Sequence, residues 1–396
     1  MRRAARPSTE VSGTWPPHRP ATPRLSPVPE PWAFAVEDTT VQLTWRALAP
    51  GPVVVEVGGR RRTTTSTGGP GSTVIDDLAP ATAHELVVTD AAGTRRVVPA
   101  TTLPPLPGPE RFRFATLSDL HLPSRVFGFW GTMQEQPHPP VSSSERAARA
   151  ALGEAVAWGA QLVVLKGDLT HRSHPEDWDA VARLVQACPV PVLAIPGNHD
   201  TKGSPGGLDP DEQLTALGVP VGRPVLIHDV PGLRIVLADT TRSGVDRGRL
   251  HHVTDLVLAA VDGAGPCLVA THHQLQPLPL PVSWPPGIAS HHGDPLLTRL
   301  AQVNPATLVT SGHTHRNRRR QVGPIVTTEV GSPKDFPGGW AGYVAHDDGI
   351  RQVVRRVSDP DVLAWTDRTA RAALGLWGRW SPGPLGHRCF VHRWPS

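Results

Sequence analysis

Residues 192–200 read Val-Leu-Ala-Ile-Pro-Gly-Asn-His-Asp, and they join an apolar stretch directly to a cluster of polar side chains. The apolar part, Val190–Ile195, has the length and composition of a buried strand. A helical pattern precedes it at Trp178–Ala187, and the same alternation of strands and helices continues along the chain. Such alternation predicts an α/β domain.

Four further predicted strands end in the same way. In open α/β sheets, ligands bind outside the carboxyl ends of the strands, so we expect the side chains at these ends to converge. The strands and the motifs after them are Phe112–Leu117 with Ser118-Asp119-Leu120-His121, Leu162–Leu165 with Lys166-Gly167-Asp168, Leu268–Ala270 with Thr271-His272-His273, and Leu308–Thr310 with Ser311-Gly312-His313-Thr314-His315.

The residue types at these strand ends are those that hold metal ions. The chain has 19 His but only 3 Cys, which are far apart, so neither a disulfide framework nor a Cys-rich zinc site fits. Imidazole and carboxylate ligands suit Zn, Mn, Fe or Co better than Ca. Two neighbouring cations need a shared ligand, and Asp168 is the natural bridging carboxylate.

In this order, Asp-x-His, Gly-Asp, Gly-Asn-His-Asp, His and Gly-His-x-His resemble the calcineurin-like metallophosphoesterase superfamily over residues 111–357. The resemblance implies a four-layer αββα sandwich that holds two divalent or trivalent metal ions (Mn, Fe or Zn). It assigns one metal ion to Asp119, His121, Asp168 and His315, and the other to Asp168, Asn198, His272 and His313.

The resemblance also implies a mechanism. A hydroxide held by the two metal ions attacks phosphorus in line, while the metals neutralise the phosphoryl oxygens. His199 does not bind metal and instead assists the leaving oxygen. Asp200 is expected to orient His199.

Three residues near these motifs keep two interpretations each. His171 lies three residues after Asp168, where purple acid phosphatases place a metal-binding Tyr, and it either contacts metal or substrate or is a loop residue. Asp239 either supports the site or caps the end of a strand. His273 either supports the site beside His272 or lies in the loop.

The remaining chain divides into four segments. Residues 1–31 are Pro-rich and predict a disordered tail, and 105–110 form a stiff linker. Short strands with frequent turns over 32–104 predict an all-β, immunoglobulin- or fibronectin-like sandwich. Within it, Leu78–His84 resembles the Leu-x-Pro-x-Thr-x-Tyr corner of fibronectin type III domains, with His84 in place of Tyr. Residues 358–396 predict a Trp-containing extension with a short helix and then an irregular tail.

Charge and hydropathy exclude several partners. The net charge of +4 resides in the two ends, because 1–31 carry +3 and 359–396 carry +2, which leaves the body at −1. A nucleic-acid-binding face is therefore not expected. No apolar stretch is long enough to span a membrane, and no secretory signal is visible, so we expect a cytoplasmic protein. The oligomeric state stays open.

The expected activity is hydrolysis of a small phosphoester. The Gly-Asn-His-Asp form resembles the class III cyclic-nucleotide phosphodiesterase branch, which favours a phosphodiester. A phosphomonoesterase similar to purple acid phosphatases but without the metal-binding Tyr is the alternative, and an inactive binding protein on the same fold is a third. Two long loops, 122–145 and 274–294, flank the motifs and carry aromatic residues that either stack on a flat substrate group or pack beneath the loops, among them Phe127, Trp130 and Trp284.

Overall fold

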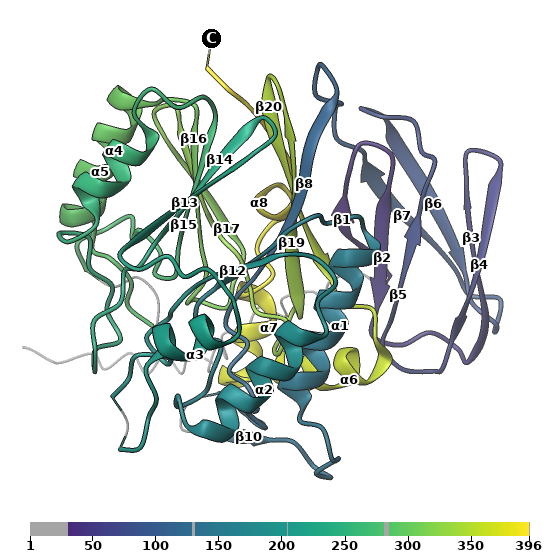
Figure 1. Cartoon of the computed structure of the whole chain (residues 1–396). Helices are drawn as coiled ribbons and strands as arrows, with labels where there is room; N and C mark the ends of the chain where they lie inside the picture. The colour runs from purple at the N-terminus through teal and green to yellow at the C-terminus, as the bar shows by residue number, and fades with distance from the viewer. Residues whose placement is uncertain (1–30, 129–130, 204, 281–284, 396) are drawn as a thin grey trace, which may run out of the picture.

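The computed structural model describes residues 31–128, 131–203, 205–280 and 285–395. The Pro-rich tail lies outside these residues except for Pro31, as do Trp130 and Trp284. The described chain forms a small all-β part followed by a larger α/β part (Figure 1). The predicted fold class is thereby confirmed.

The all-β part consists of seven strands in two antiparallel sheets. Alternating side chains of a strand such as β3 are buried (Val53, Val55 and Val57), so each sheet turns one apolar face inward. The three-stranded sheet has the order β1 (Trp32–Val36), β2 (Val41–Trp45), β5 (Gly71–Ile75), and the four-stranded sheet has the order β4 (Arg60–Ser66), β3 (Gly51–Val57), β6 (Ala83–Thr89), β7 (Arg95–Thr101).

His84 makes the kind of bond that a corner Tyr makes. Its Nε2 lies 3.0 Å from the carbonyl oxygen of Ala79, five residues upstream. In a tyrosine corner the phenol hydroxyl bonds the backbone a few residues upstream in the same manner. An imidazole therefore substitutes for the phenol at this turn, while the fibronectin resemblance itself stays a prediction.

Two six-stranded sheets pack face to face in the α/β part. One has the order β12 (Val192–Ile195), β11 (Val163–Lys166), β8 (Glu110–Leu117), β19 (Gly339–His346), β20 (Gly349–Arg356), β21 (Phe390–Arg393). The other has the order β13 (Val225–Val230), β14 (Leu233–Ala238), β15 (Cys267–Thr271), β16 (Thr307–Ser311), β18 (Ile325–Glu329), β17 (Arg318–Val322).

Helices cover the outer face of each sheet, which completes four layers (Figure 1). Within β11, Val164 belongs to the core between the sheets, whereas Val163 and Leu165 face the helices. Burial on both faces explains why these parallel strands are continuously apolar rather than alternating. The helices are α1 (Ser143–Ala157), α2 (Pro175–Gln186) and α3 (Pro210–Ala216) on the first sheet, and α4 (Thr254–Val261) and α5 (Ser290–Val303) on the second.

The C-terminal segment differs from the predicted irregular tail. After α6 (Pro360–Thr369), η2 (Ala373–Gly375), α7 (Leu376–Trp380) and α8 (Leu385–Arg388), the chain forms strand β21, which pairs antiparallel with β20. Phe390 is buried in the core there. The tail prediction was wrong because β20 offers an open sheet edge, and only the folded sheet reveals that edge.

The two flanking loops also contain regular structure. Loop 122–145 holds the hairpin β9 (Val126–Phe127) and β10 (Met133–Gln134), and its last residues begin α1. The Phe127 ring lies 5.4 Å from the Trp377 ring between centroids, so this aromatic residue packs against the C-terminal segment. The last residues of the predicted loop 274–294 belong to α5, which begins at Ser290. No helix among the described residues is long and apolar enough to cross a membrane.

Candidate metal centre

The turns that carry the predicted ligands share an unusual backbone conformation. Asp119, His121, Asp168, His313 and His315 all have positive φ angles, between 46° and 69°. This left-handed region is costly for residues with a side chain and is concentrated at functional sites. Hydrogen bonds between neighbouring turns hold it in place, since the amide of Asp119 donates to the carbonyl of Gly167 at 3.0 Å and that of His121 to Asp168 at 2.9 Å.

Two glycines of the motifs leave room for the ligand side chains. A Cβ on Gly197 would lie 2.2 Å from Asp168 Oδ1, and a Cβ on Gly312 would lie 2.6 Å from Asp119 Oδ2. No ordinary side chain fits at such distances. The Gly-Asn-His-Asp and Gly-His-x-His motifs therefore need glycine for close approach.

The first group of ligand atoms comes from the turns after β8 and β16. The Nε2 atoms of His121 and His315 are 3.1 Å apart, and His315 Nε2 lies 3.5 Å from Asp119 Oδ1. All three residues offer ligand atoms within 4.8 Å of one another. Asp119 is fully buried, and both of its carboxylate oxygens accept from the amide of His313 at 3.0 Å.

The second group comes from the turns after β12, β15 and β16. His272 Nε2 lies 3.1 Å from both Asn198 Oδ1 and His313 Nδ1. His273 also lies beside His313, with ring centroids 4.5 Å apart, but its Nδ1 bonds Thr240 Oγ1 at 2.9 Å. His272 faces Asn198, which favours it as the predicted ligand. His273 also belongs to a cluster with His272 and His313 that could hold a metal, and its Nε2 has no hydrogen-bond partner among the described residues.

Asp168 stands between the two groups. Its Oδ2 lies 3.6 Å from His121 Nε2, and its Oδ1 lies 3.4 Å from His272 Nε2. One oxygen thus faces each group, as a carboxylate shared by two cations requires. The seven residues predicted as ligands therefore lie in neighbouring turns, and Asp119, Asp168 and His272 also offer ligand atoms within 4.8 Å of one another.

The tautomers of the rings test whether this arrangement suits a metal. His272 Nδ1 bonds the carbonyl of Lys166 at 2.8 Å, and His313 Nε2 bonds the carbonyl of Pro286 at 3.3 Å. Each nitrogen must donate its proton to that carbonyl, so in neutral rings the opposite nitrogens, 3.1 Å apart, carry only lone pairs. Facing lone pairs need a proton or a cation between them, and the donor set fits a metal ion.

The pKa values of His272 and Asp168 are shifted in opposite directions by their mutual attraction. Burial opposes a charge on His272, but the carboxylate of Asp168 outweighs it and raises the pKa of His272 to about 9. Burial alone would raise the pKa of Asp168, yet His272 and His199 hold it well below the usual range. Without a metal, a proton on His272 takes the place of a cation.

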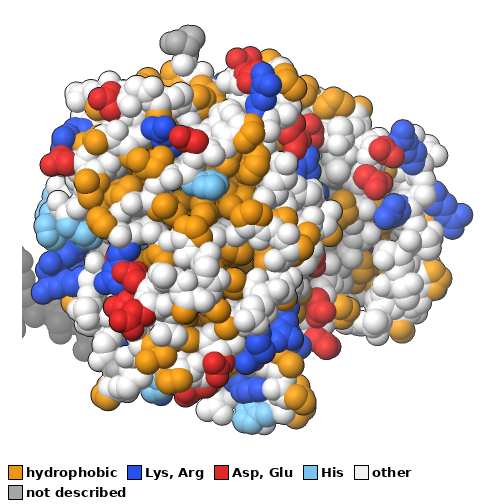
Figure 2. Space-filling view, in the orientation of Figure 1, with side chains coloured by type: hydrophobic (Ala, Val, Ile, Leu, Met, Phe, Trp, Pro, Cys, Tyr) orange, Lys and Arg blue, Asp and Glu red, His pale blue; other side chains and the backbone are white. Residues whose placement is uncertain are grey.

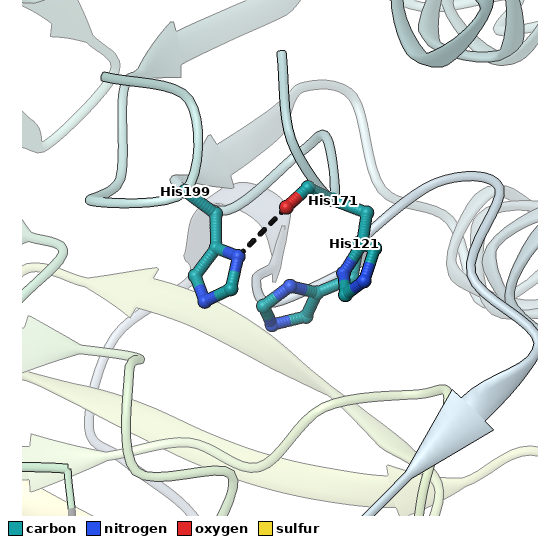
Figure 3. Close-up of side chains that lie close together, drawn as sticks. All are labelled: His121, His171 and His199. Atoms are coloured by element: carbon teal, nitrogen blue, oxygen red, sulfur yellow. Dashed lines mark hydrogen bonds between the residues drawn. The ribbon is translucent and has the colours of Figure 1, made fainter. Parts of the chain in front are cut away.

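His121, His171 and His199 form a third cluster at the edge of the first group (Figure 3). His199 Nδ1 donates to the carbonyl of His171 at 2.8 Å, which leaves Nε2 as the free nitrogen of that ring. Burial lowers the pKa of His171 to about 3, so its ring is neutral. The structure thus brings His171 to the site, where its Nδ1 has no hydrogen-bond partner among the described residues.

The partner expected for Asp200 was wrong. Its Oδ1 accepts bonds from the amide and hydroxyl of Thr170 at 2.8 and 2.7 Å, and its Oδ2 accepts from the amide of Gly197 at 2.8 Å. The imidazole of His199 is held by His171 instead. Asp200 is buried. Because its carboxylate accepts from Thr170 and Gly197, it connects the turns after β11 and β12 and does not orient the ring of His199.

Asp239 behaves as a strand-end cap. Its carboxylate accepts from the amide of Thr241 at 2.6 Å and pairs with Arg223 at 3.1 Å. It belongs to none of the clusters that can hold a metal among the described residues.

Residues 112–317 match the family model of the calcineurin-like phosphoesterases. The chain belongs to this family. It is 26% identical to a probable cyclic nucleotide phosphodiesterase of Synechococcus over 51% of this chain and 78% of that protein. It is 28% identical to a 3′,5′-cyclic adenosine monophosphate phosphodiesterase of Pseudomonas aeruginosa over 41% of this chain and 57% of that protein. The solved structure of PhoD aligns with 85% of this chain and 89% of that chain at 12% identity, with a TM-score of 0.42.

Sequence reasoning missed three residues of this calcineurin-like phosphoesterase. Asp335 and Lys334 follow the strand β18, and Asp335 Oδ2 lies 2.6 Å from His315 Nδ1. Lys334 is buried, and its charge adds to the effect of burial in lowering the pKa of His121. Asp246 lies in the loop after β14, and its Oδ1 accepts from Asn198 Nδ2 at 3.3 Å. Lys334 and Asp335 follow a strand as the five motifs do, so the same pattern could have identified them. Asp246 does not directly follow a predicted strand, and no sequence pattern identifies it.

Proposed function

We propose that this chain hydrolyses a small phosphodiester at a centre that holds two metal ions, Mn, Fe or Zn. The observation that carries the proposal is the position of Asp168, with one carboxylate oxygen toward each group of ligand atoms. The proposed ligands are Asp119, His121, Asp168 and His315 for one ion, and Asp168, Asn198, His272 and His313 for the other. The names of the relatives from Synechococcus and Pseudomonas aeruginosa support a diester rather than a monoester.

When bound, two such ions supply an activated water and neutralise phosphoryl oxygens. The residues of the chain orient the ligand rings and provide a proton for the leaving group. Each of three proposed ligand rings is oriented through the nitrogen that does not face the metal site. The Nδ1 of His315 bonds Asp335, the Nδ1 of His272 bonds the carbonyl of Lys166, and the Nε2 of His313 bonds the carbonyl of Pro286.

We assign His199 to the leaving group. Its Nδ1 is held by the carbonyl of His171, and its ring stands edge-on to His121 with centroids 4.5 Å apart. His199 belongs to a cluster with His121 and His171, and its Nε2 is the nitrogen not held by a carbonyl. In the proposed role, that nitrogen donates a proton to the oxygen that departs from phosphorus. General acid catalysis of this kind contributes about 10²–10⁴-fold.

The test combines metal analysis with two model substrates. Protein reconstituted with Mn, Fe or Zn is expected to bind two equivalents of metal and to hydrolyse bis-p-nitrophenyl phosphate better than p-nitrophenyl phosphate. His199→Gln should lower turnover and keep the metal, whereas Asp168→Asn should lose both.

The outcomes separate the alternatives. A strong preference for the monoester would assign the protein to the phosphomonoesterases instead. A protein that binds two metal ions and hydrolyses no phosphoester would be an inactive binding protein. A metal content that never exceeds one equivalent would contradict the shared role of Asp168.

A further inference from the structure

A basic cavity lies next to the candidate metal centre. It has a volume of about 370 Å³ and is lined by the loop that follows β14, by the start of α5 and by the residues before it. No Asp or Glu lines it among the described residues, and its ionisable lining residues are all basic: Arg242, Arg247, Arg249, His251, His291 and His292. Figure 2 shows His side chains beside Lys or Arg side chains at the left edge of the molecule, below α4 and α5.

The three arginines of this cavity lack an acidic partner. No ion pair among the described residues involves Arg242, Arg247 or Arg249. Other arginines of the same half of the molecule are paired, for example Arg234 with Asp229 at 2.7 Å and Arg299 with Asp255 at 3.0 Å. Arg242 and Arg247 are exposed and Arg249 is half-buried. Guanidinium groups stay charged at every physiological pH, so the cavity carries three positive charges that an anion can compensate.

The cavity wall is also the wall of the metal centre. A Cβ on the lining residue Gly248 would lie 2.6 Å from the Cβ of His273. The lining residue Gly287 follows Pro286, whose carbonyl accepts from His313. Asp246, in the same loop as the arginines, directs its Oδ1 to Asn198 at 3.3 Å. The cavity and the candidate metal centre are therefore neighbours, and a phosphodiester that is bound at the centre and extends past this wall would approach the arginines.

We propose that this cavity binds a second phosphate group of the substrate. The inference rests on the proposed function, and it narrows the substrate to a phosphodiester that carries a further phosphate some distance from the bond that breaks. Arginine recognises phosphate with paired N–H donors, and a phosphate dianion compensates the unpaired charges of the cavity.

A matched pair of esters tests the proposal. Thymidine 5′-(p-nitrophenyl phosphate) and its 3′-phosphorylated form contain the same scissile bond and differ by one phosphate. With metal-reconstituted protein, we expect the 3′-phosphate to raise kcat/KM about tenfold, as a charge-assisted hydrogen bond would. The double variant Arg242→Gln/Arg247→Gln should bring the ratio for the two esters close to one. Arg299→Gln, whose partner Asp255 lies outside the cavity, is the matched control and should keep the wild-type ratio.

A binding measurement on metal-free protein is independent of activity. Calorimetry should show tighter binding of thymidine 3′,5′-bisphosphate than of thymidine 5′-phosphate, and the double variant should lose the difference. Equal binding together with equal kcat/KM for the two esters would overturn the inference and leave the proposed function intact. If the protein hydrolyses neither ester but still binds the bisphosphate more tightly than thymidine 5′-phosphate, the proposed function is overturned. The phosphate-binding role of the cavity is then supported.

Inorganic phosphate separates a substrate group from a free effector. If millimolar phosphate changes hydrolysis of the unphosphorylated ester in the wild type and not in the double variant, while the 3′-phosphate gives no advantage, the cavity binds a free anion. That result would overturn the assignment to the substrate.

Discussion

Asp335 Oδ2 lies 2.6 Å from His315 Nδ1, and Asp335 is completely buried. The carboxylate fixes the ring so that Nε2 faces His121 and Asp119. It also raises the pKa of His315, although burial by itself acts in the opposite direction. Such carboxylate–imidazole pairs orient a ligand ring and increase its basicity.

Replacing this carboxylate should weaken one metal ion selectively. For Asp335→Asn, we expect affinity for one of the two ions to fall about 10–100-fold, because the ring loses its orienting acceptor. Metal titration monitored by elemental analysis would show one equivalent retained and one lost. Asp347→Asn, at an exposed carboxylate paired with Arg111, is the control and should keep both. Unchanged binding of both ions in Asp335→Asn would exclude this role.

Metal loading should release a proton from His272. With its pKa raised to about 9 by Asp168 against the effect of burial, this ring is protonated near pH 7.5 in metal-free protein. A metal must displace that proton, so affinity should increase with pH up to about 9. Calorimetric titrations in buffers of different ionisation enthalpy count the released protons. A binding enthalpy that is the same in all buffers would contradict the prediction.

Gly312→Ala should displace the side chains of the candidate metal centre, because the turn at Gly312 has no room for a Cβ. The added Cβ would lie 2.4 Å from Ser118 Oγ and 2.6 Å from Asp119 Oδ2, and neither atom is at the end of a long flexible side chain. We expect a loss of metal together with a fall in the free energy of unfolding of about 1–3 kcal/mol. Gly153→Ala is the matched control, since a Cβ there meets nothing within 4 Å and helix α1 gains stability. Denaturant unfolding and metal analysis would be compared for both variants.

Glu37 connects the all-β part to the α/β part. Its carboxylate accepts from Trp158 Nε1 at 3.2 Å and from Arg355 Nε at 3.0 Å, and the residue is buried. Glu37→Gln would leave Arg355 without its counterion, which should reduce the free energy of unfolding by about 1–3 kcal/mol. Arg111→Gln removes an exposed pair and should have a much smaller effect. A Glu37→Gln variant as stable as the wild type would show that this contact contributes nothing.

The ends of the buried strands could be predicted from the sequence, because each of these strands is a short apolar run that stops at a polar motif. Val163–Lys166 and Val192–Ile195 lie where the pattern places them, and their motifs meet at one edge of the fold. The C-terminal strand was not readable, since Phe390–Arg393 has no strong pattern of its own and becomes a strand by pairing with β20. The role of Asp200 was misjudged for a related reason: adjacency in sequence to His199 says nothing about the direction of a buried carboxylate.

The sequence by itself determined which residues are candidate ligands, because motifs that follow the strands of an α/β sheet are brought to one edge of that sheet. Tertiary structure alone decided which atoms face one another. Asp168 divides its two oxygens between the groups, and Asp335 and Asp246 arrive from other strands and loops. Three arginines without an ion-pair partner among the described residues line one cavity, whose lining residue Gly248 lies against His273. These relationships depend on contacts between segments far apart in the chain, which local sequence patterns do not encode.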